Sequence, residues 1–391
     1  MLNKSIPKVI LFHRTIAPEY DDRLNKIFAT FDKFGISSAH AYLWDRTNTS
    51  RSGRFSHGGF WTLLKIPFGS KAIPRPGAIY TAYEIFVETF QSIRIIRRNR
   101  PNVIILQNHR MFLLAFFLVA FNKSRYRLIW DLRELPKGFY NNGILPRIFF
   151  AYLMENFDVV IATNEARKKF LEDFFGSRSL LNSIVLPNYP LLDAGFSSVE
   201  SILLKNSEIY SNQPFVYIQS ANSPSRYPYN SVKAALLATN SSVVVTGDFD
   251  QKALNDLKVE FGDVLEQRVS FLGYVSSMQI KFLLSKSLVS LIFYESTEPN
   301  NEFCEPNRLY QAISNGVPVI VGINQGLSRL VTQLKCGVIL PDDGSSLSSV
   351  INAFSVLIKD YDKYKSNADA AKNKLSWEDV EYRLIESVLT L

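Results

Sequence analysis

The sequence has 391 residues, of which 44 are Lys or Arg and 36 are Asp or Glu, so its formal net charge at pH 7 is +8. With 47% apolar and 20% charged residues, the chain is too hydrophobic for an intrinsically disordered protein, and its length predicts two domains. The excess of positive charge predicts an anionic partner, which leaves nucleic acid, an anionic membrane surface and a phosphorylated ligand as candidates.

The opening of the chain predicts a β-α-β arrangement. The apolar run at residues 8–12 (KVILF) is too short for a signal peptide and suits a buried strand. Apolar residues then recur at intervals of three and four over residues 23–34, which predicts a helix that ends at Gly35. A second strand is expected at residues 38–43.

The same alternation continues through the first half. We expect helices at 81–98 and 111–121, and strands at 103–106, 128–130 and 159–162. Strands that are apolar on both faces and separated by helices predict a doubly wound parallel sheet.

Two segments of this half allow more than one interpretation. Residues 48–77 contain several Gly, Arg and Pro residues and predict a long irregular loop, either an acceptor loop or a tolerated insertion. Residues 111–121 (MFLLAFFLVAF) are fewer than the roughly 18 apolar residues that span a bilayer. They form either a core helix or an interfacial one.

A polar stretch at residues 196–213 has the composition of a linker, so we place a first domain at 1–195 and a second at 214–372. Two Rossmann-like domains facing a cleft are expected, because ligands of such sheets bind outside the carboxyl ends of the strands. In the second domain, strands are predicted at 215–219, 242–246, 269–272, 289–293, 317–321 and 337–340, and helices at 232–238, 278–284 and 308–314.

Ten stretches carry a resemblance to a known family, in which they follow the same order. In the second half they are FVYIQSANSPSRYPYNSVKAAL at 215–236, VVVTGDF at 243–249, RVSFLGYVSSMQIKFLLSKSLVSLIFY at 268–294, EPNRLYQAISNGVPVI at 305–320 and SWEDVEYRL at 376–384. In the first half they are DDRLNKIFATFDKFG at 21–35, RPNVIILQNH at 100–109, LIWDLRELP at 128–136 and FDVVIATNEARKKFL with VLPNYP within 157–190. The chain resembles GT-B glycosyltransferases, in particular glycosyltransferase family 4 (group 1).

The resemblance implies a GT-B fold of the α/β class, with an N-terminal acceptor-binding domain and a C-terminal nucleotide-sugar-binding domain. It implies that residues 373–391 form a helix returning to the N-terminal domain. The implied activity is transfer of a sugar from a nucleotide-diphosphate sugar to a glycan or lipid-linked glycan in surface polysaccharide biosynthesis, with retention of configuration. No cofactor other than this donor, and no metal, is expected.

Residues 303–322 (FCEPNRLYQAISNGVPVIVG) place more polar groups at a helix start than capping requires. The backbone N–H groups of Asn307, Arg308 and Leu309 would face a diphosphate, whose negative charge a helix N-terminus favours. Arg308 would add a forked contact. In the alternative interpretation, Glu305 is only a helix-capping carboxylate and Arg308 a solvated arginine.

Two carboxylates of the family are absent from this sequence. Where the family has a ribose-binding Glu and a sugar-facing Glu, this chain has Gln311 and Phe303. The resemblance implies that Gln311 binds the ribose as a neutral group, and that Glu302 or Glu305 takes the sugar-facing role.

The resemblance also assigns a loop arginine and a nucleobase site. Arg226 matches the basic residue that reaches the diphosphate, although the glycine that usually follows it is Tyr227 here. Tyr274 and Val275 stand where the family contacts the nucleobase; a plain loop arginine and a plain strand-to-helix turn are the alternatives. We therefore expect catalytic roles for Glu305, Arg308 and Arg226, and donor contacts from Tyr274, Val275, Asn307, Leu309, Gln311 and Glu302.

Acceptor contacts are expected in the first half. Asp131, Arg133 and Glu134 match a family segment that often reads Asp-x-His-Glu, so Arg133 replaces a histidine base. Asp131 or Glu134 would contact the acceptor, or a strand-end carboxylate would simply pair with Arg133. His109 would line the cleft or lie on the surface.

Metal binding is not expected from the other acidic and cysteine residues. The four histidines form no ligand pattern, and the implied place of Asp248 and Asp250 is a strand-to-helix loop, despite their DxD spacing. Cys304 and Cys336 have no metal-like spacing, and so few cysteines favour a reducing, cytoplasmic compartment.

Four arginines, Arg94, Arg97, Arg98 and Arg100, follow an apolar helical pattern and suit attachment to the anionic inner face of the cell membrane. A solvated basic face on a core helix is the alternative. Nucleic acid is disfavoured, because no aromatic-basic recognition motif occurs. Two rival functions remain: a non-catalytic GT-B partner subunit, and a sugar-nucleotide epimerase, against which Arg133 in place of histidine argues.

Overall fold

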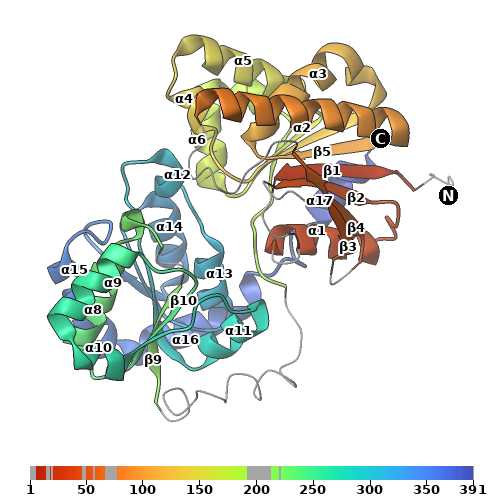
Figure 1. The fold of residues 1–391 in the computed structure, drawn as a ribbon. Coiled ribbons are helices and arrows are strands. Elements are labelled where there is room, and N and C mark those ends of the chain that lie inside the picture. The colour runs from red at the N-terminus through yellow and green to blue at the C-terminus, as the bar shows by residue number, and fades with distance from the viewer. Residues whose placement is uncertain are drawn as a thin grey trace. The chain divides into compact units, whose positions relative to one another are not determined.

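The computed structural model describes residues 6–14, 18, 21–45, 50–55, 58–66, 77–191, 213–219 and 222–390. The chain forms two compact units, one of Met1–Pro187 with Glu378–Leu391 and the other of Asn188–Trp377 (Figure 1). The first unit thus ends at Pro187, where the sequence predicted residue 195. The predicted linker lies outside the described residues except for its last residue.

The first unit is built on an eight-stranded sheet in the order β3-β4-β2-β1-β5-β6-β7-β8. Among the described strands of this sheet, only β3 runs antiparallel to its neighbour. The strands are β1 (Val9–Arg14), β2 (His40–Asp45), β3 (Arg51–Arg54), β4 (Phe60–Lys65), β5 (Val103–Gln107), β6 (Arg127–Leu132), β7 (Val159–Ala162) and β8 (Ser183–Val185). The prediction of an irregular loop over 48–77 was therefore wrong at β3 and β4, which form a short hairpin in which Trp61 and Leu63 of β4 are buried.

Helices lie on both faces of this sheet (Figure 1). On one face, α1 (Asp22–Lys33) packs against α17 (Glu381–Leu389), where Glu381 accepts hydrogen bonds from Thr30 and Lys33. On the other, α3 (Phe112–Asn122) contacts both α2 (Ala78–Asn99) and α5 (Ile144–Glu155). The unit also contains α4 (Lys137–Tyr140) and α6 (Glu165–Phe175). No helix in the described part of the chain is both long enough and apolar enough to cross a membrane.

The second unit holds a six-stranded parallel sheet in the order β11-β10-β9-β12-β13-β14. Its strands are β9 (Phe215–Gln219), β10 (Val243–Thr246), β11 (Val269–Phe271), β12 (Ser287–Ile292), β13 (Val319–Val321) and β14 (Gly337–Ile339). Alternate residues of β9 enter two separate apolar cores, Val216 and Ile218 one, Phe215 and Tyr217 the other. Burial on both faces explains why these strands are almost continuously apolar.

The first of these cores lies under α8 (Pro228–Ala238), α9 (Gln251–Phe261), α10 (Asp263–Arg268) and α15 (Leu347–Lys359). The second lies under α11 (Ser277–Ser285), α13 (Asn307–Ser314), α14 (Gln325–Leu334) and α16 (Tyr361–Ala371). A short helix, α12 (Pro299–Glu302), precedes α13. The predicted α/β class with two doubly wound Rossmann-like sheets is confirmed.

The strand order reverses between β9 and β12, which are neighbours in the sheet although β10 and β11 separate them in the chain. In open parallel sheets, ligands bind beyond the carboxyl ends of the strands at such a switch point. The loops that follow β9 and β12 are therefore the first place to look for a site.

Candidate functional site

Two arginines meet one tyrosine ring beyond the carboxyl ends of β9 and β12. The guanidinium of Arg226, in the 3-10 turn η6 (Pro224–Arg226), lies 5.4 Å from the centre of the Tyr294 ring. That of Arg308, on α13, lies 4.4 Å from the same ring. The structure thus brings together the two residues predicted to contact a diphosphate, and both charges stand at the switch point.

Arg308 is not a solvated helix arginine, so that alternative was wrong: only 6% of the residue is exposed. Its Nη1 donates to the carbonyl oxygen of Gln219 at 2.7 Å and its Nη2 to that of Phe293 at 3.0 Å. Burial lowers the pKa of Arg308, and the nearby charge of Arg226 acts in the same direction. Both Nη atoms of the guanidinium thus bind main-chain carbonyls. Arg308 therefore links the ends of β9 and β12 and supplies a fixed positive charge.

The first turn of α13 offers fewer amides than predicted. Leu309 is fully buried, and its N–H donates to the carbonyl of Pro306 at 2.9 Å. Asn307 and Arg308 stand in the first turn, where the helix itself provides no acceptor for an N–H. The side-chain oxygen of Asn307 accepts a hydrogen bond from the amide of Asn188.

Glu305 and Glu302 fasten α14 to the segment ahead of α13. Glu305 accepts hydrogen bonds from Arg329 at 2.6 Å and from the hydroxyl of Tyr310, and Glu302 accepts from the N–H of Gln325 at 3.0 Å. The alternative in which Glu305 caps α13 was wrong, because the N-cap residue is Pro306 and no side chain in the described part of the chain caps this helix. Both carboxylates thus have structural partners within the second unit.

The loops after β10 and β11 are joined to each other. The N–H of Gly247 donates to the carbonyl of Gly273 at 2.6 Å, and the hydroxyl of Tyr274 donates to Asp248 at 2.7 Å. Tyr274 is nevertheless 81% exposed, and Val275 beside it is half-buried. An exposed ring above an ordered turn is a surface on which a planar group can stack.

The DxD pair has structural partners. Asp248 is bound by Tyr274, and Asp250 caps α9 by accepting from the N–H of Ala253 at 2.8 Å. Over the described ranges, no three His, Cys, Asp or Glu residues are grouped so that they could hold a metal ion. On α13, the side-chain oxygen of Gln311 is buried and has no hydrogen-bond partner among the described residues.

An aspartate that the sequence interpretation missed ties three loops together at this edge. Asp343, after β14, accepts from the hydroxyl of Tyr227 at 2.9 Å and from the N–H of Ser296 at 2.9 Å. Burial acts to raise the pKa of Asp343, but hydrogen bonds from Ser296, Ser345 and Tyr227 outweigh it and hold the pKa below its ordinary value. The Asp-Asp-Gly turn after a predicted strand was the available signal.

In the first unit, Asp131 accepts hydrogen bonds from Arg23 and Gln107, and not from Arg133. Arg23 donates to it through Nε and Nη2, both at 2.8 Å, and Gln107 donates at 2.9 Å. Arg133 instead pairs with Asp21 at 2.9 Å and contacts His13, a buried residue that the sequence interpretation missed. The predicted alternative in which Asp131 pairs with Arg133 was therefore wrong.

Glu134 is the most accessible of the four predicted acceptor-side residues, while His109 and Arg133 are half-buried and Asp131 is buried. Glu134 is exposed, and His109, in the 3-10 turn η2 (His109–Met111), is half-buried. Burial lowers the pKa of His109, whereas the charge of Glu134 acts to raise it. This places a neutral imidazole near a carboxylate just beyond the carboxyl end of β5.

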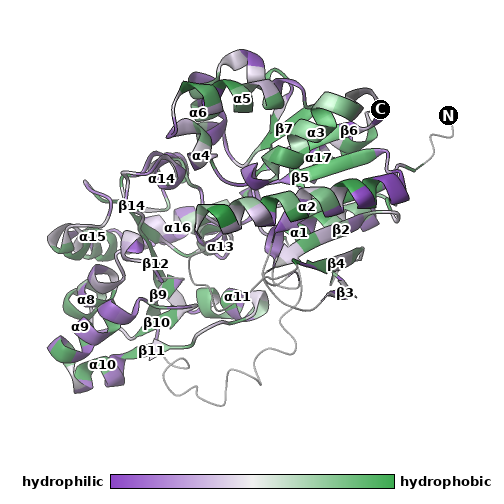
Figure 2. Cartoon of the chain, turned by 45° about the horizontal axis from the view of Figure 1, so that its top comes forward, coloured by the Kyte–Doolittle hydropathy of each residue, from purple (hydrophilic) through white to green (hydrophobic). Residues whose placement is uncertain are grey.

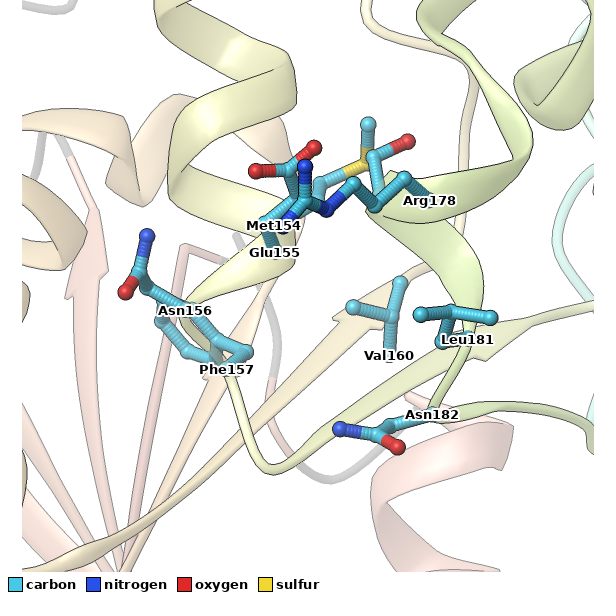
Figure 3. A pocket seen from close by; sticks show the side chains of 9 residues that line it. Met154, Glu155, Asn156, Phe157, Val160, Arg178, Leu181 and Asn182 are labelled. Atoms are coloured by element: carbon cyan, nitrogen blue, oxygen red, sulfur yellow. The ribbon is translucent and has the colours of Figure 1, made fainter.

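A cavity of about 300 Å³ lies elsewhere in this unit, between the end of α5 and the 3-10 turn η4 (Ser177–Leu180) (Figure 3). Asn156 and Phe157 line it just ahead of β7, and Asn182 just ahead of β8. It therefore lies at the amino ends of these strands, the edge opposite to the one that carries the candidate residues.

No family model and no curated protein matches this chain. Among solved structures, sucrose-phosphate synthase from Thermosynechococcus elongatus superposes with a TM-score of 0.71 at 13% identity, over 96% of this chain and 97% of that one. Anabaena Alr3699/HepE in complex with UDP superposes with a TM-score of 0.70 at 16% identity, over 98% of this chain and 100% of that one. The trehalose-6-phosphate structure from E. coli bound with UDP-2-fluoro glucose superposes with a TM-score of 0.69 at 9% identity, over 98% of this chain and 99% of that one. Since all three are GT-B structures matched over nearly their whole length, this chain has the GT-B fold.

Proposed function

We propose that this protein is a glycosyltransferase that moves a sugar from a nucleotide-diphosphate sugar to a glycan or lipid-linked glycan acceptor. The observation that carries the proposal is the convergence of Arg226 and Arg308 on Tyr294 at the switch point of the second sheet. The names of two structures with the same fold, at low identity, include UDP or a UDP-sugar.

The chemistry requires positive charge beside the departing phosphates, because the leaving group gathers negative charge as the sugar becomes oxocarbenium-like. Arg308 supplies that charge from a buried, fixed position, and the start of α13 adds the positive end of its helix dipole. Arg226 is half-buried, so it is the arginine able to contact the phosphates directly. Tyr274 would stack on the nucleobase.

Arg226→Ala is the test of this assignment. With purified full-length protein, a thermal-shift panel of UDP-, GDP-, CMP- and TDP-sugars first identifies the donor. Arg226→Ala should then weaken donor binding about 10- to 100-fold, the cost of a charge-assisted contact. Arg178→Ala, at an exposed arginine of the first unit, is the matched control and should bind the donor as the wild type does.

Equal donor affinity in the two variants would contradict the assignment. Arg308→Ala is a poorer test, because removing a buried guanidinium leaves two carbonyls unpaired and destabilises the second unit in any case.

A non-catalytic partner subunit is the second candidate. The observation in its favour is that Glu302 and Glu305 hold α14, while Gln311 and Phe303 replace the carboxylates that the family resemblance implies. Hydrolysis of the identified nucleotide sugar by the purified protein would favour the transferase. Donor binding without hydrolysis or transfer would favour the partner subunit.

We further propose that the reaction retains the anomeric configuration, serves surface polysaccharide assembly and takes place in the cytoplasm. Retention rests on the likeness to family 4 in sequence motifs alone. The anomeric configuration of the first-formed product, read by proton NMR during turnover, tests it directly.

A further inference from the structure

The outer face of α2 carries no negative charge. The two acidic residues of this helix, Glu84 and Glu88, are buried. Both bind Arg14, at 2.9 and 2.7 Å, and Arg110 also binds Glu84, at 2.8 Å. Both carboxylates of α2 thus form ion pairs with arginines of the first unit.

The residues that α2 turns outward are apolar at first and cationic afterwards. Ile79, Phe86 and Phe90 are exposed, and Phe90 is followed one turn later by the exposed Arg94, whose guanidinium lies 5.4 Å from the Phe90 ring. Arg97 and Arg98 are exposed as well, and Figure 2 shows the hydrophilic colour at this end of the helix. Residues four apart share one face of a helix, so Phe86, Phe90 and Arg94 form one stripe.

The helices α3 and α5, which contact each other, also expose large apolar side chains. α3 contains no charged residue, and its Phe121 is 71% exposed. On α5, Ile144 and Ile148 are exposed and Leu145 is 77% exposed. Figure 2 shows α3 in the hydrophobic colour, whereas α5 also has hydrophilic segments. A helix facing water normally carries polar residues outward, so exposed apolar side chains on three packed helices indicate an interaction surface.

A groove between α2 and α3 combines both characters. Its volume is about 630 Å³, and the rings of Phe117 and Phe121 line it together with Arg97, Arg100 and Arg125. An apolar wall beside three guanidinium groups matches a molecule that has a hydrocarbon part and an anionic head.

We propose that the outer face of α2, α3 and α5 docks on a lipid bilayer that contains anionic phospholipids. The side chains of Phe86, Phe121 and Leu145 enter the hydrocarbon boundary, and the arginines at the end of α2 bind the headgroup phosphates. A second copy of this chain is a poor occupant, because an isologous contact would bring these arginines against each other. The inference needs no nucleotide sugar, so it stands or falls separately from the transfer reaction.

Co-sedimentation of the full chain with vesicles tests the proposal. We expect binding to phosphatidylcholine vesicles containing about 30% phosphatidylglycerol, weaker binding at high salt, and little binding to pure phosphatidylcholine. The double variant Arg97→Gln/Arg98→Gln should bind about 30-fold more weakly, at about five-fold for each arginine. Phe121→Ser/Leu145→Ser should lose about ten-fold or more.

The matched control is Lys252→Gln/Lys258→Gln, which removes two exposed charges from α9 in the second unit and should bind as the wild type does. Wild-type binding by both test variants, or equal binding to both vesicle types, would overturn the proposal. The proposal would also be overturned if the wild type formed an oligomer and the Phe121→Ser/Leu145→Ser variant were monomeric, because this face would then bind a second copy of the chain. Unchanged thermal unfolding of the variants confirms that they are folded.

Discussion

Tyr227 holds a backbone conformation that usually belongs to glycine. Its φ is 47°, in the left-handed region where a side chain is unfavourable. The hydroxyl is anchored on Asp343, which also binds Ser296, so a side-chain bond at 2.9 Å helps to offset the backbone cost. The turn beside Arg226 therefore keeps its shape without the glycine expected at this position.

Tyr227→Phe should destabilise the second unit by about 1 kcal/mol, because it removes this hydrogen bond and keeps the left-handed backbone. Urea denaturation measures the change. The control is Tyr229→Phe, which removes an exposed hydrogen bond to Glu260 and should change the free energy of unfolding much less. Equal losses in the two variants would show that Asp343 does not hold the turn.

The roles of single residues were predictable from sequence only where local position decides them. A helix at 308–314 follows from the spacing of its apolar residues, and the structure has it, beginning one residue earlier at Asn307. The partners of Arg308 were not predictable, because Gln219 lies 89 residues away and only the sheet order brings it close. For the same reason the pairing of Asp131 with Arg23 was missed.

At the scale of elements, the close approach of α14 to the segment before α13 depends on Gly326. A Cβ atom there would lie 2.3 Å from the carbonyl oxygen of Cys304, which is main chain and cannot turn aside. The bonds from Arg329 to Glu305 and from Gln325 to Glu302 cross the same contact.

Gly326→Ala should therefore cost about 1 to 3 kcal/mol in unfolding free energy, although alanine favours a helix. Donor binding should weaken as well, because the segment before α13 would shift. Gly138→Ala in α4 is the matched control, since nothing lies within 4 Å of its new Cβ, and it should leave stability unchanged or slightly raised. Chemical denaturation that finds the two variants equally stable would contradict this account.

Strands with long apolar runs were predicted well, and the hairpin of β3 and β4 was not. Apolar runs such as residues 243–246 are buried on both faces and leave a strong signal. β3 reads RSGR and has no apolar residue, and it pairs only because Trp61 and its neighbours on β4 provide a partner strand. Pairing with a partner strand that lies further along the chain leaves no signal in such a segment.

For the whole molecule, the distribution of histidines separates the two units. All four, His13, His40, His57 and His109, precede residue 110, so the second unit contains none. Burial lowers the pKa of His13, His40 and His109 in the folded chain, while His57 lies outside the described residues. Acid should therefore act on the two units unequally.

The sign follows from proton binding. As the pH falls through about 6.5, the unfolded chain takes up protons on these histidines before the folded chain does, so the first unit loses stability below that pH and not above it. Between pH 7.5 and 5.5, hydrogen exchange followed by mass spectrometry should show faster opening of peptides from β1, β2 and β5, with peptides from β9 and β12 unchanged. His109→Gln should reduce the difference, because it removes one group with a lowered pKa. Equal loss of protection in both units would show that the histidines are not the cause, since the second unit contains no histidine.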